Sequence, residues 1–285
     1  MIERGRKKRM KPCYLDYNAG EPISEFVAQT LTELHSIPMG NPNSLHSLGM
    51  KARREVNRAR DVIARAIGTH PSKLRFTAGG SSANTSVLVH SVMSALGEGR
   101  RARIIYGATE HPSLRQPILN MERQGLCKAH ELRVNSKGQP NLDQLQELAQ
   151  EADGLFLMAA NNETGVLHDM AAISRIIDTS NIHWHCDAVQ LLGKQRLNFG
   201  SGSWRSVSSA SVSAHKLGGP PGCGALILNA SYNPTLRQLR CQFVVANENA
   251  EYFFLTNPLS NRGTDSLHDH AKLICGLKMC QIGNP

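Results

Sequence analysis

Three features are scarce or missing in this sequence: aromatic residues, long apolar runs and paired cysteines. Aromatic side chains make up only 5% of the 285 residues, and no apolar run approaches the roughly 20 residues that cross a bilayer. The seven cysteines are irregularly spaced without a CxxC pair, and no apolar secretory-signal segment follows the basic start. These absences argue against a membrane protein and against an exported, disulfide-rich one. They favour reduced thiols and a cytoplasmic location, with the mitochondrion as the alternative.

The net charge of +9 is concentrated at the start of the chain. Residues 1–11 carry six basic side chains and one acidic one, which leaves only +4 for the other 274 residues. We interpret residues 1–13 as a disordered basic terminus, and a nucleic-acid-binding run is the alternative. Because the body of the chain is only mildly basic, we expect no nucleic-acid partner.

Short β-branched and apolar runs alternate with helical patterns along most of the chain. This alternation predicts an α/β domain with a mostly parallel sheet. The alternating pattern covers residues 14–230, and the residues after 230 show no clear helix or strand period. The expected strands are 75–78, 103–108, 128–134, 154–160, 183–188, 206–212 and 224–229. The expected helices are Met50–Ile67, Ser82–Leu96, Pro112–Gln124, Leu142–Glu151 and Met170–Ile177.

Polar residues stand directly after several of these expected strands. In open α/β sheets ligands bind at the carboxyl ends of the strands, so these positions are the candidate site residues. They fall into five groups: Gly79 to Asn84, which open a helix; Thr109, Glu110 and His111; Asn161, Asn162 and Glu163; Asp187 and Gln190; and Ser213, His215 and Lys216.

This combination of residues suggests a pyridoxal phosphate site. Lys216 is placed to form a Schiff base with the cofactor aldehyde, and a carboxylate at Asp187 is placed to keep a pyridine nitrogen protonated. The Gly79-Gly80-Ser81-Ser82 stretch at a helix start offers backbone N–H groups and hydroxyls to a phosphate.

Each residue also has a simpler interpretation when it is taken alone. His111 can cap a helix, Asp187 can be the N-cap of a helix that begins at Ala188, and a glycine pair can form a bare turn. His183, His185, Cys186 and Asp187 invite a zinc hypothesis. We predict no metal site, because alternate residues of a strand face opposite sides and only two of these side chains can converge.

Matching stretches, in order from residue 14 to 264, resemble the cysteine desulfurases and selenocysteine lyases of the class V aminotransferase group. The stretches ANNETG and GKQR are more similar to the selenocysteine lyase branch. The resemblance rests on YLDYNAGEP (14–22), GNPNSLHSLG (40–49), FTAGGSSAN (76–84), EH (110–111), NNETGVL (161–167), HCDAVQLLGKQRL (185–197), SAHKLGGPPGCGAL (213–226) and NRGT (261–264).

The resemblance implies pyridoxal 5′-phosphate as cofactor and a role for each residue near its ring. Lys216 would be the Schiff-base lysine, and His111 would stack on the ring and take part in proton transfer. Asp187 would pair with the pyridine nitrogen, while Asn162 and Gln190 would reach the ring hydroxyl.

The resemblance also implies a phosphate site, a homodimer and a two-domain architecture. Gly80, Ser81, Ser213 and His215 would contact the phosphate, and Thr264 would reach the phosphate of the neighbouring subunit. The implied fold is pyridoxal-phosphate fold type I, with a seven-stranded sheet flanked by helices. A partial small domain would comprise 231–285, with part of 14–50 contributing to it.

The sequence departs from the family pattern at three places. Ser81-Ser82 stands where the family has Thr-Glu, and Cys241–Ser260 replaces a glycine-rich stretch. The family's nucleophilic cysteine lies several dozen residues beyond the RGT motif, whereas this sequence ends 21 residues after Thr264. We interpret Cys275 and Cys280 as structural thiols in an apolar helix-like stretch.

Two functions follow as expectations. The first is removal of sulfur or selenium from L-cysteine or L-selenocysteine to leave L-alanine, with an acceptor protein as a further partner. The second is a shortened homologue that binds cofactor or partner without turnover.

Overall fold

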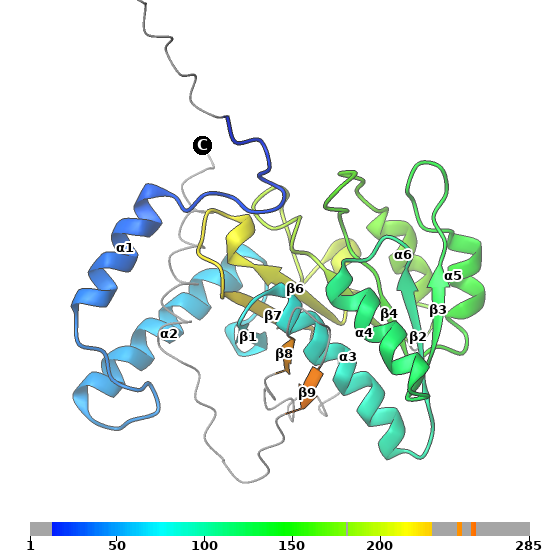
Figure 1. The fold of residues 1–285 in the computed structure, drawn as a ribbon, viewed down its shortest axis with the longest axis horizontal. Helices are drawn as coiled ribbons and strands as arrows, with labels where there is room; N and C mark the ends of the chain where they lie inside the picture. Colours follow the sequence, from blue (N-terminus) through cyan, green and yellow to red (C-terminus); the bar gives the residue numbers. More distant parts are fainter. Residues whose placement is uncertain (1–12, 181, 230–243, 247–251, 255–285) are drawn as a thin grey trace, which may run out of the picture.

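The computed structural model describes residues 13–180, 182–229, 244–246 and 252–254, and its centre is a seven-stranded sheet (Figure 1). The strand order is β1-β7-β6-β5-β4-β2-β3. Only β7 runs antiparallel to its neighbours within this sheet, so the predicted mostly parallel α/β sheet is confirmed. The strands are β1 Leu74–Thr77, β2 Ala102–Gly107, β3 Cys127–Leu132, β4 Gly154–Phe156, β5 His183–Asp187, β6 Ser209–Ser213 and β7 Gly224–Leu228.

All seven predicted strands are present, with shorter or shifted ends. The expected strand 154–160 is regular only as far as Phe156. Its continuation still bonds to β5, since Leu157 N donates to His185 O at 3.1 Å and Ala159 N donates to Asp187 O at 3.1 Å. The expected strand 206–212 begins at Ser209, after a 3-10 turn over Gly202–Trp204.

Of the six α-helices in the described part of the chain, five match predicted ones, and the sixth, α1, was not predicted. Only Val27 of α1 is buried, so the helix lacks the apolar repeat that marks α2. Its start is fixed by Ser24, whose hydroxyl accepts a hydrogen bond from Val27 N at 3.2 Å. The helices are α1 Glu25–Ser36, α2 Ser47–Ala66, α3 Gly80–Gly97, α4 Pro112–Arg123, α5 Leu142–Leu148 and α6 Met170–Ile177.

Helices cover both faces of the sheet, which gives three layers. Successive residues of β2 alternate between two separate apolar clusters, because neighbouring side chains of a strand point to opposite faces. Ile105 packs on the side of α2, α5 and α6, whereas Ile104 and Tyr106 pack on the side of α3 and α4. Burial on both faces explains why β2, β4 and β7 are mostly apolar rather than alternating.

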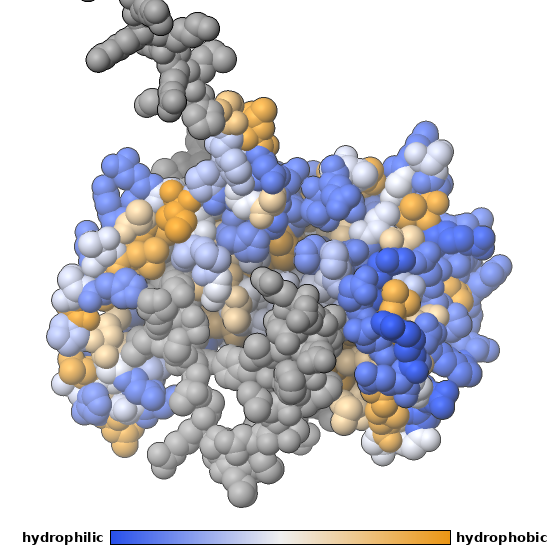
Figure 2. Space-filling view, in the orientation of Figure 1, coloured by the Kyte–Doolittle hydropathy of each residue, from blue (hydrophilic) through white to orange (hydrophobic). Residues whose placement is uncertain are grey.

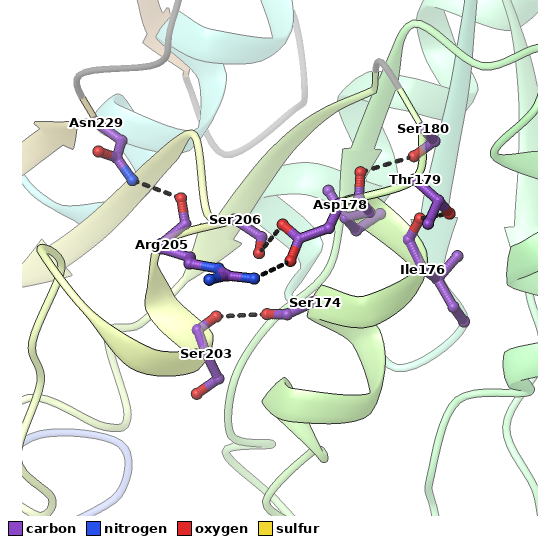
Figure 3. Close-up of polar contacts among 10 residues, drawn as sticks. Ser174, Ile176, Asp178, Thr179, Ser180, Ser203, Arg205, Ser206 and Asn229 are labelled. Atoms are coloured by element: carbon purple, nitrogen blue, oxygen red, sulfur yellow. Dashed lines mark hydrogen bonds and ion pairs between the residues drawn. The ribbon is translucent and has the colours of Figure 1, made fainter.

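The end of α6 is fastened to the segment before β6 by side-chain contacts (Figure 3). Asp178 accepts from Arg205 Nη2 and from Ser206 Oγ, both at 2.7 Å. The Ser206 hydroxyl and the Arg205 guanidinium lower the pKa of the Asp178 carboxyl. Ser174 Oγ also donates to Ser203 O at 2.5 Å. These contacts hold the loop that leads into β6, the strand that precedes the candidate lysine.

Gly224 in β7 is in close contact with the backbone that leads into α3. An added Cβ would lie 2.6 Å from the carbonyl carbon of Gly79 and 2.7 Å from Val212 O, and both atoms belong to the backbone. We therefore expect Gly224→Ala to lower the free energy of unfolding by roughly 1–3 kcal/mol, measured by urea denaturation. The control is Gly97→Ala, because an added Cβ there meets nothing within 4 Å. Equal stability of the two variants would refute the close-approach argument.

The predicted domain boundary near residue 230 stays a prediction. Residues 1–12 of the basic start lie outside the described residues, and beyond 229 only the backbone of β8 (Val244–Ala246) and β9 (Tyr252–Phe254) is described. These two strands pair with each other in an antiparallel way. In the part of the chain that the structure describes, no helix is both long and apolar enough for a bilayer span.

Candidate active site

A cavity of about 1040 Å³ lies at the carboxyl ends of the parallel strands, where α/β sheets bind ligands. The lining includes nine of the ten predicted site residues, and Thr264 lies outside the described residues. The nine come from loops after five strands, so the fold brings together segments far apart in sequence. They are Gly80, Ser81, His111, Asn162, Asp187, Gln190, Ser213, His215 and Lys216.

Lys216 ends a short 3-10 turn, Ala214–Lys216, directly after β6. Its Nζ donates to the carbonyl oxygens of Asn18 and Ala19, the latter at 3.0 Å. Partial burial lowers the pKa of Lys216, and the positive charge of Lys194 lowers it further. A larger share of Lys216 is therefore the neutral amine, the form that attacks a carbonyl.

The segment 13–22, drawn in blue in Figure 1, contributes Asp16, Asn18 and Ala19 to the lining of this cavity. Asn18 is its main anchor, because its carbonyl accepts from Gln190 Nε2 at 3.0 Å and its Oδ1 accepts from Lys194 Nζ at 3.2 Å. Lys194 Nζ also donates to Gln190 Oε1 at 2.7 Å. Glu21 N donates to His215 O at 2.9 Å and completes the attachment.

Asp187 is the last residue of β5, and only 7% of it is exposed. Its Oδ2 accepts from Asn84 Nδ2 at 2.7 Å, and its Oδ1 accepts from Val189 N at 3.0 Å. The alternative that Asp187 caps a helix from Ala188 is wrong, because the residues after it form turns. The carboxylate caps the first of these turns and also lines the cavity.

His111 is both a helix cap and a cavity residue. It is the N-cap of α4, and its Nδ1 accepts from Ser113 N at 3.1 Å. The Ser113 hydroxyl lies 2.8 Å from the same nitrogen. Because Nδ1 is used as an acceptor, a neutral ring carries its proton on Nε2. The capping interpretation is therefore confirmed, and the functional role of His111 stays a prediction.

Polar groups suited to an anion line another side of the cavity. The first turn of α3 contributes Gly80 and Ser81, and the free N–H groups of a helix start attract negative charge. An added Cβ on Gly80 would lie 2.6 Å from Val189 Cγ2, so glycine allows this close packing. Ser213 Oγ lies 2.8 Å from His215 Nδ1. Burial, Lys216 and His111 together lower the pKa of His215.

Asn161 and Asn162 have different positions although they are neighbours. Asn162 lines the cavity, as predicted. Asn161 is buried and holds the turn, since its Oδ1 accepts from Glu163 N at 3.0 Å and from Thr164 N at 2.8 Å.

The histidines considered for zinc belong to a hydrogen-bonded network instead. His185 is fully buried, and burial lowers its pKa to about 3. Its ring nitrogen Nδ1 lies 2.8 Å from Ser209 Oγ, and Nε2 lies 2.9 Å from Asn84 Oδ1. Among the described residues no three histidine, cysteine or acidic side chains are arranged to hold a metal ion.

Several residues of this region were not assigned a role from the sequence. Asn18 lies in a segment without periodicity, and no local pattern indicates that it reaches strand ends about 170 residues later. Glu110 is buried behind the cavity, where its Oε1 accepts from Met158 N at 2.7 Å. Burial, with a smaller effect from the Asp187 charge, raises its pKa well above the usual range, which favours the protonated form. Buried Asn84 joins Asp187 to Ser113.

Comparison with known proteins places this arrangement in a family. The aminotransferase class-V profile matches residues 13–267. A cysteine desulfurase of Sinorhizobium fredii is 31% identical over 221 residues, which cover 77% of this chain and 56% of that protein. An IscS-like cysteine desulfurase of Mycobacterium tuberculosis is 32% identical over 221 residues, which cover 76% of this chain and 55% of that protein. The chain thus spans about half the length of these curated relatives.

Solved structures agree with the sequence relatives. A NifS-like protein matches with a TM-score of 0.77 and 25% identity, over 93% of this chain and 68% of that one. DndA of Streptomyces lividans matches with a TM-score of 0.69 and 25% identity, over 95% of this chain and 72% of that one. This chain therefore belongs to the class-V aminotransferase family, whose cysteine desulfurase members use pyridoxal 5′-phosphate, the cofactor predicted from its sequence.

Proposed function

We propose that this chain removes sulfur from L-cysteine to leave L-alanine, and acts on L-selenocysteine by the same chemistry, with pyridoxal phosphate held at Lys216. The observation that carries the proposal is the convergence of Lys216, Asp187 and His111 on one cavity. A lysine amine, a buried carboxylate and a histidine are the groups that chemistry at an amino-acid carbon requires around this cofactor.

The residues of the cavity fit the cofactor. Asp187 is a buried carboxylate for which no ion pair with a lysine, arginine or histidine is found among the described residues. A buried anion without a cationic partner is costly, and a protonated pyridine nitrogen would supply that partner. The Lys216 amine is made more nucleophilic by its lowered pKa.

Each predicted residue has a proposed contact with the cofactor. Asp187 would hold the ring nitrogen, His111 would lie against the ring, and Asn162 and Gln190 would reach the ring hydroxyl. The phosphate would be held by the start of α3 and the turn after β6, and Thr264 would reach the phosphate of a neighbouring subunit. These phosphate contacts are Gly80, Ser81, Ser213 and His215.

The proposed reaction needs proton movements that these side chains can perform. When bound, pyridoxal phosphate supplies an aldehyde that condenses with amines and a ring that withdraws electrons from the substrate carbon. Lys216 would hold the cofactor aldehyde, and its amine, when free, could accept and return a proton at Nζ. His111 can deliver a proton from Nε2. The C–S bond breaks, sulfur passes to an acceptor thiol as a persulfide, and the substrate carbon gains a proton as alanine forms.

Alanine release from the purified 285-residue chain, with dithiothreitol as the acceptor thiol, tests the proposal. We expect alanine and sulfide from L-cysteine, and alanine and selenide from L-selenocysteine. Cofactor binding without alanine from either substrate would contradict the proposed activity and favour a homologue that binds without turnover. A second series, with candidate acceptor proteins in place of dithiothreitol, tests the proposed acceptor partner.

The positive charge of Lys194 near Lys216 leads to a prediction about the pH dependence of cofactor incorporation. Because the positive charge of Lys194 lowers the pKa of Lys216, Lys194→Met raises that pKa and reduces the neutral amine at neutral pH. We expect slower cofactor incorporation at neutral pH and recovery at higher pH, followed by absorbance in a stopped-flow series. Lys137→Met, at an exposed position, is the control. An unchanged pH profile for Lys194→Met would contradict the prediction.

The proposal includes a homodimer. Nine of the eleven exposed large apolar side chains among the described residues lie between positions 14 and 50, and Figure 2 shows apolar residues along α1. A patch of this kind marks an interaction surface. We expect sedimentation equilibrium to give a dimer for the unsubstituted chain. The double variant Leu15→Glu and Leu45→Glu should form a weaker dimer. A monomeric unsubstituted chain would contradict the proposed homodimer. The nine are Tyr14, Leu15, Tyr17, Ile23, Phe26, Ile37, Leu45, Leu48 and Met50.

The proposed location is the cytoplasm, with the mitochondrion as the alternative. The described cysteines, Cys13, Cys127, Cys186 and Cys223, are all free thiols, which suits a reducing compartment. Cell fractionation with an antibody to the chain distinguishes the two locations.

A further inference from the structure

Asn84 lines the cavity and lies at the centre of a buried hydrogen-bond network. Only 1% of this residue is exposed. Its Nδ2 donates to Asp187 Oδ2 at 2.7 Å and to Ser113 Oγ at 3.1 Å. Its Oδ1 lies 2.5 Å from Ser211 Oγ and 2.9 Å from His185 Nε2. Both amide hydrogens and both carbonyl lone pairs are thus used.

The chemistry of the partners fixes the orientation of this amide. A carboxylate only accepts hydrogen bonds, so the amide nitrogen must face Asp187 and the amide oxygen must face His185. His185 therefore carries its proton on Nε2, and its Nδ1 accepts from Ser209 Oγ at 2.8 Å. The reversed amide would place an oxygen against the carboxylate and require the other tautomer of His185.

The second amide hydrogen prevents rotation away from Asp187. It is donated to Ser113 Oγ, and the Ser113 hydroxyl can then donate to His111 Nδ1 at 2.8 Å. Asn84 is held at its oxygen from β5 and β6 and at its nitrogen from the start of α4. A side chain fixed on three sides presents its N–H to Asp187 with little freedom, which is how a neighbouring residue preorganises a functional group.

We propose that Asn84 is a positioning residue that aims the Asp187 carboxylate at the cofactor's ring nitrogen. The inference rests on the role of Asp187 in the proposed function. Asp187 has one backbone donor, Val189 N, and one side-chain donor, Asn84 Nδ2. Without Asn84 the Oδ2 atom loses its partner, and the carboxylate is free to turn from the ring.

The test compares two cofactors in unsubstituted protein and in Asn84→Leu, which has nearly the same size but no polar atoms. The cofactors are pyridoxal phosphate and its 1-deaza analogue, in which carbon replaces the ring nitrogen. We expect Asn84→Leu to weaken binding of pyridoxal phosphate by about 10- to 100-fold, the effect of one hydrogen bond to a charged group. We expect the affinity for the deaza analogue to be nearly unchanged. Ser211→Ala is the comparison variant: it removes one contact to Asn84 Oδ1 but leaves both amide hydrogens in place, so we expect it to weaken pyridoxal phosphate binding less than Asn84→Leu does.

The outcomes separate this inference from the proposed function. Equal weakening of both cofactors in Asn84→Leu indicates a general structural role and overturns the inference alone. Equal binding of both cofactors by unsubstituted protein overturns the role of Asp187, and the inference with it. If Asn84→Leu does not fold, ¹⁵N NMR of unsubstituted protein still tests the inference, because the tautomer of His185 reports the orientation of the Asn84 amide. A proton on Nδ1 would reverse the amide and overturn the inference.

Discussion

Replacing Lys216 with alanine should abolish covalent cofactor attachment and reduce alanine release on the order of 10⁴-fold or more, as when other enzymes lose a nucleophile. The reason is local: Lys216 ends the turn after β6 and lines the cavity, where burial makes its amine more nucleophilic. Among the described residues the other lysine at this edge, Lys194, is held by Asn18 and Gln190.

Borohydride reduction followed by peptide mass spectrometry measures this result directly. In unsubstituted protein the reduced cofactor should be found on the peptide that contains Lys216, and in Lys216→Ala on no lysine. Lys128→Ala, at an exposed position of β3, is the matched control and should retain the modified peptide and full alanine release. Cofactor on another lysine of the unsubstituted chain would refute the assignment.

Asp187→Asn should reduce kcat/KM for L-cysteine by about 10²- to 10³-fold, the cost of removing one preorganised electrostatic partner. The substitution keeps the size of the side chain and the acceptor for Val189 N at 3.0 Å. It removes the negative charge, so the pyridine nitrogen is no longer held in its protonated form. The expected loss is therefore mainly electrostatic, and urea denaturation of the variant measures any loss of stability at the Asn84 contact, where two amide N–H₂ groups would meet.

Steady-state kinetics of alanine release, together with cofactor affinity, checks this prediction. Asp178→Asn is the matched control, because Asp178 pairs with Arg205 at the end of α6 and does not line the cavity. We expect the control to keep its activity. A loss smaller than about threefold in Asp187→Asn would show that its charge is not used.

The structure confirms most of the fold that the sequence pattern predicts, and its differences have physical causes. The apolar runs of β2 and β7 are buried on both faces, so they stand out in the sequence. Helix α1 buries only Val27 and carries no such signal. Strand β4 ends earlier than its apolar run, because the chain leaves the regular ladder after Phe156 while its side chains stay buried.

The sequence by itself determined which residues we propose for the chemistry: Lys216, Asp187 and His111 stand out because each lies beside a predicted strand or at a helix start. Only the tertiary structure decided which side chains orient them. Asn84 is 103 residues from Asp187, and Asn18 is 198 residues from Lys216. Hydrogen bonds over such separations leave no local pattern, because they form only when the sheet has brought the strand ends together.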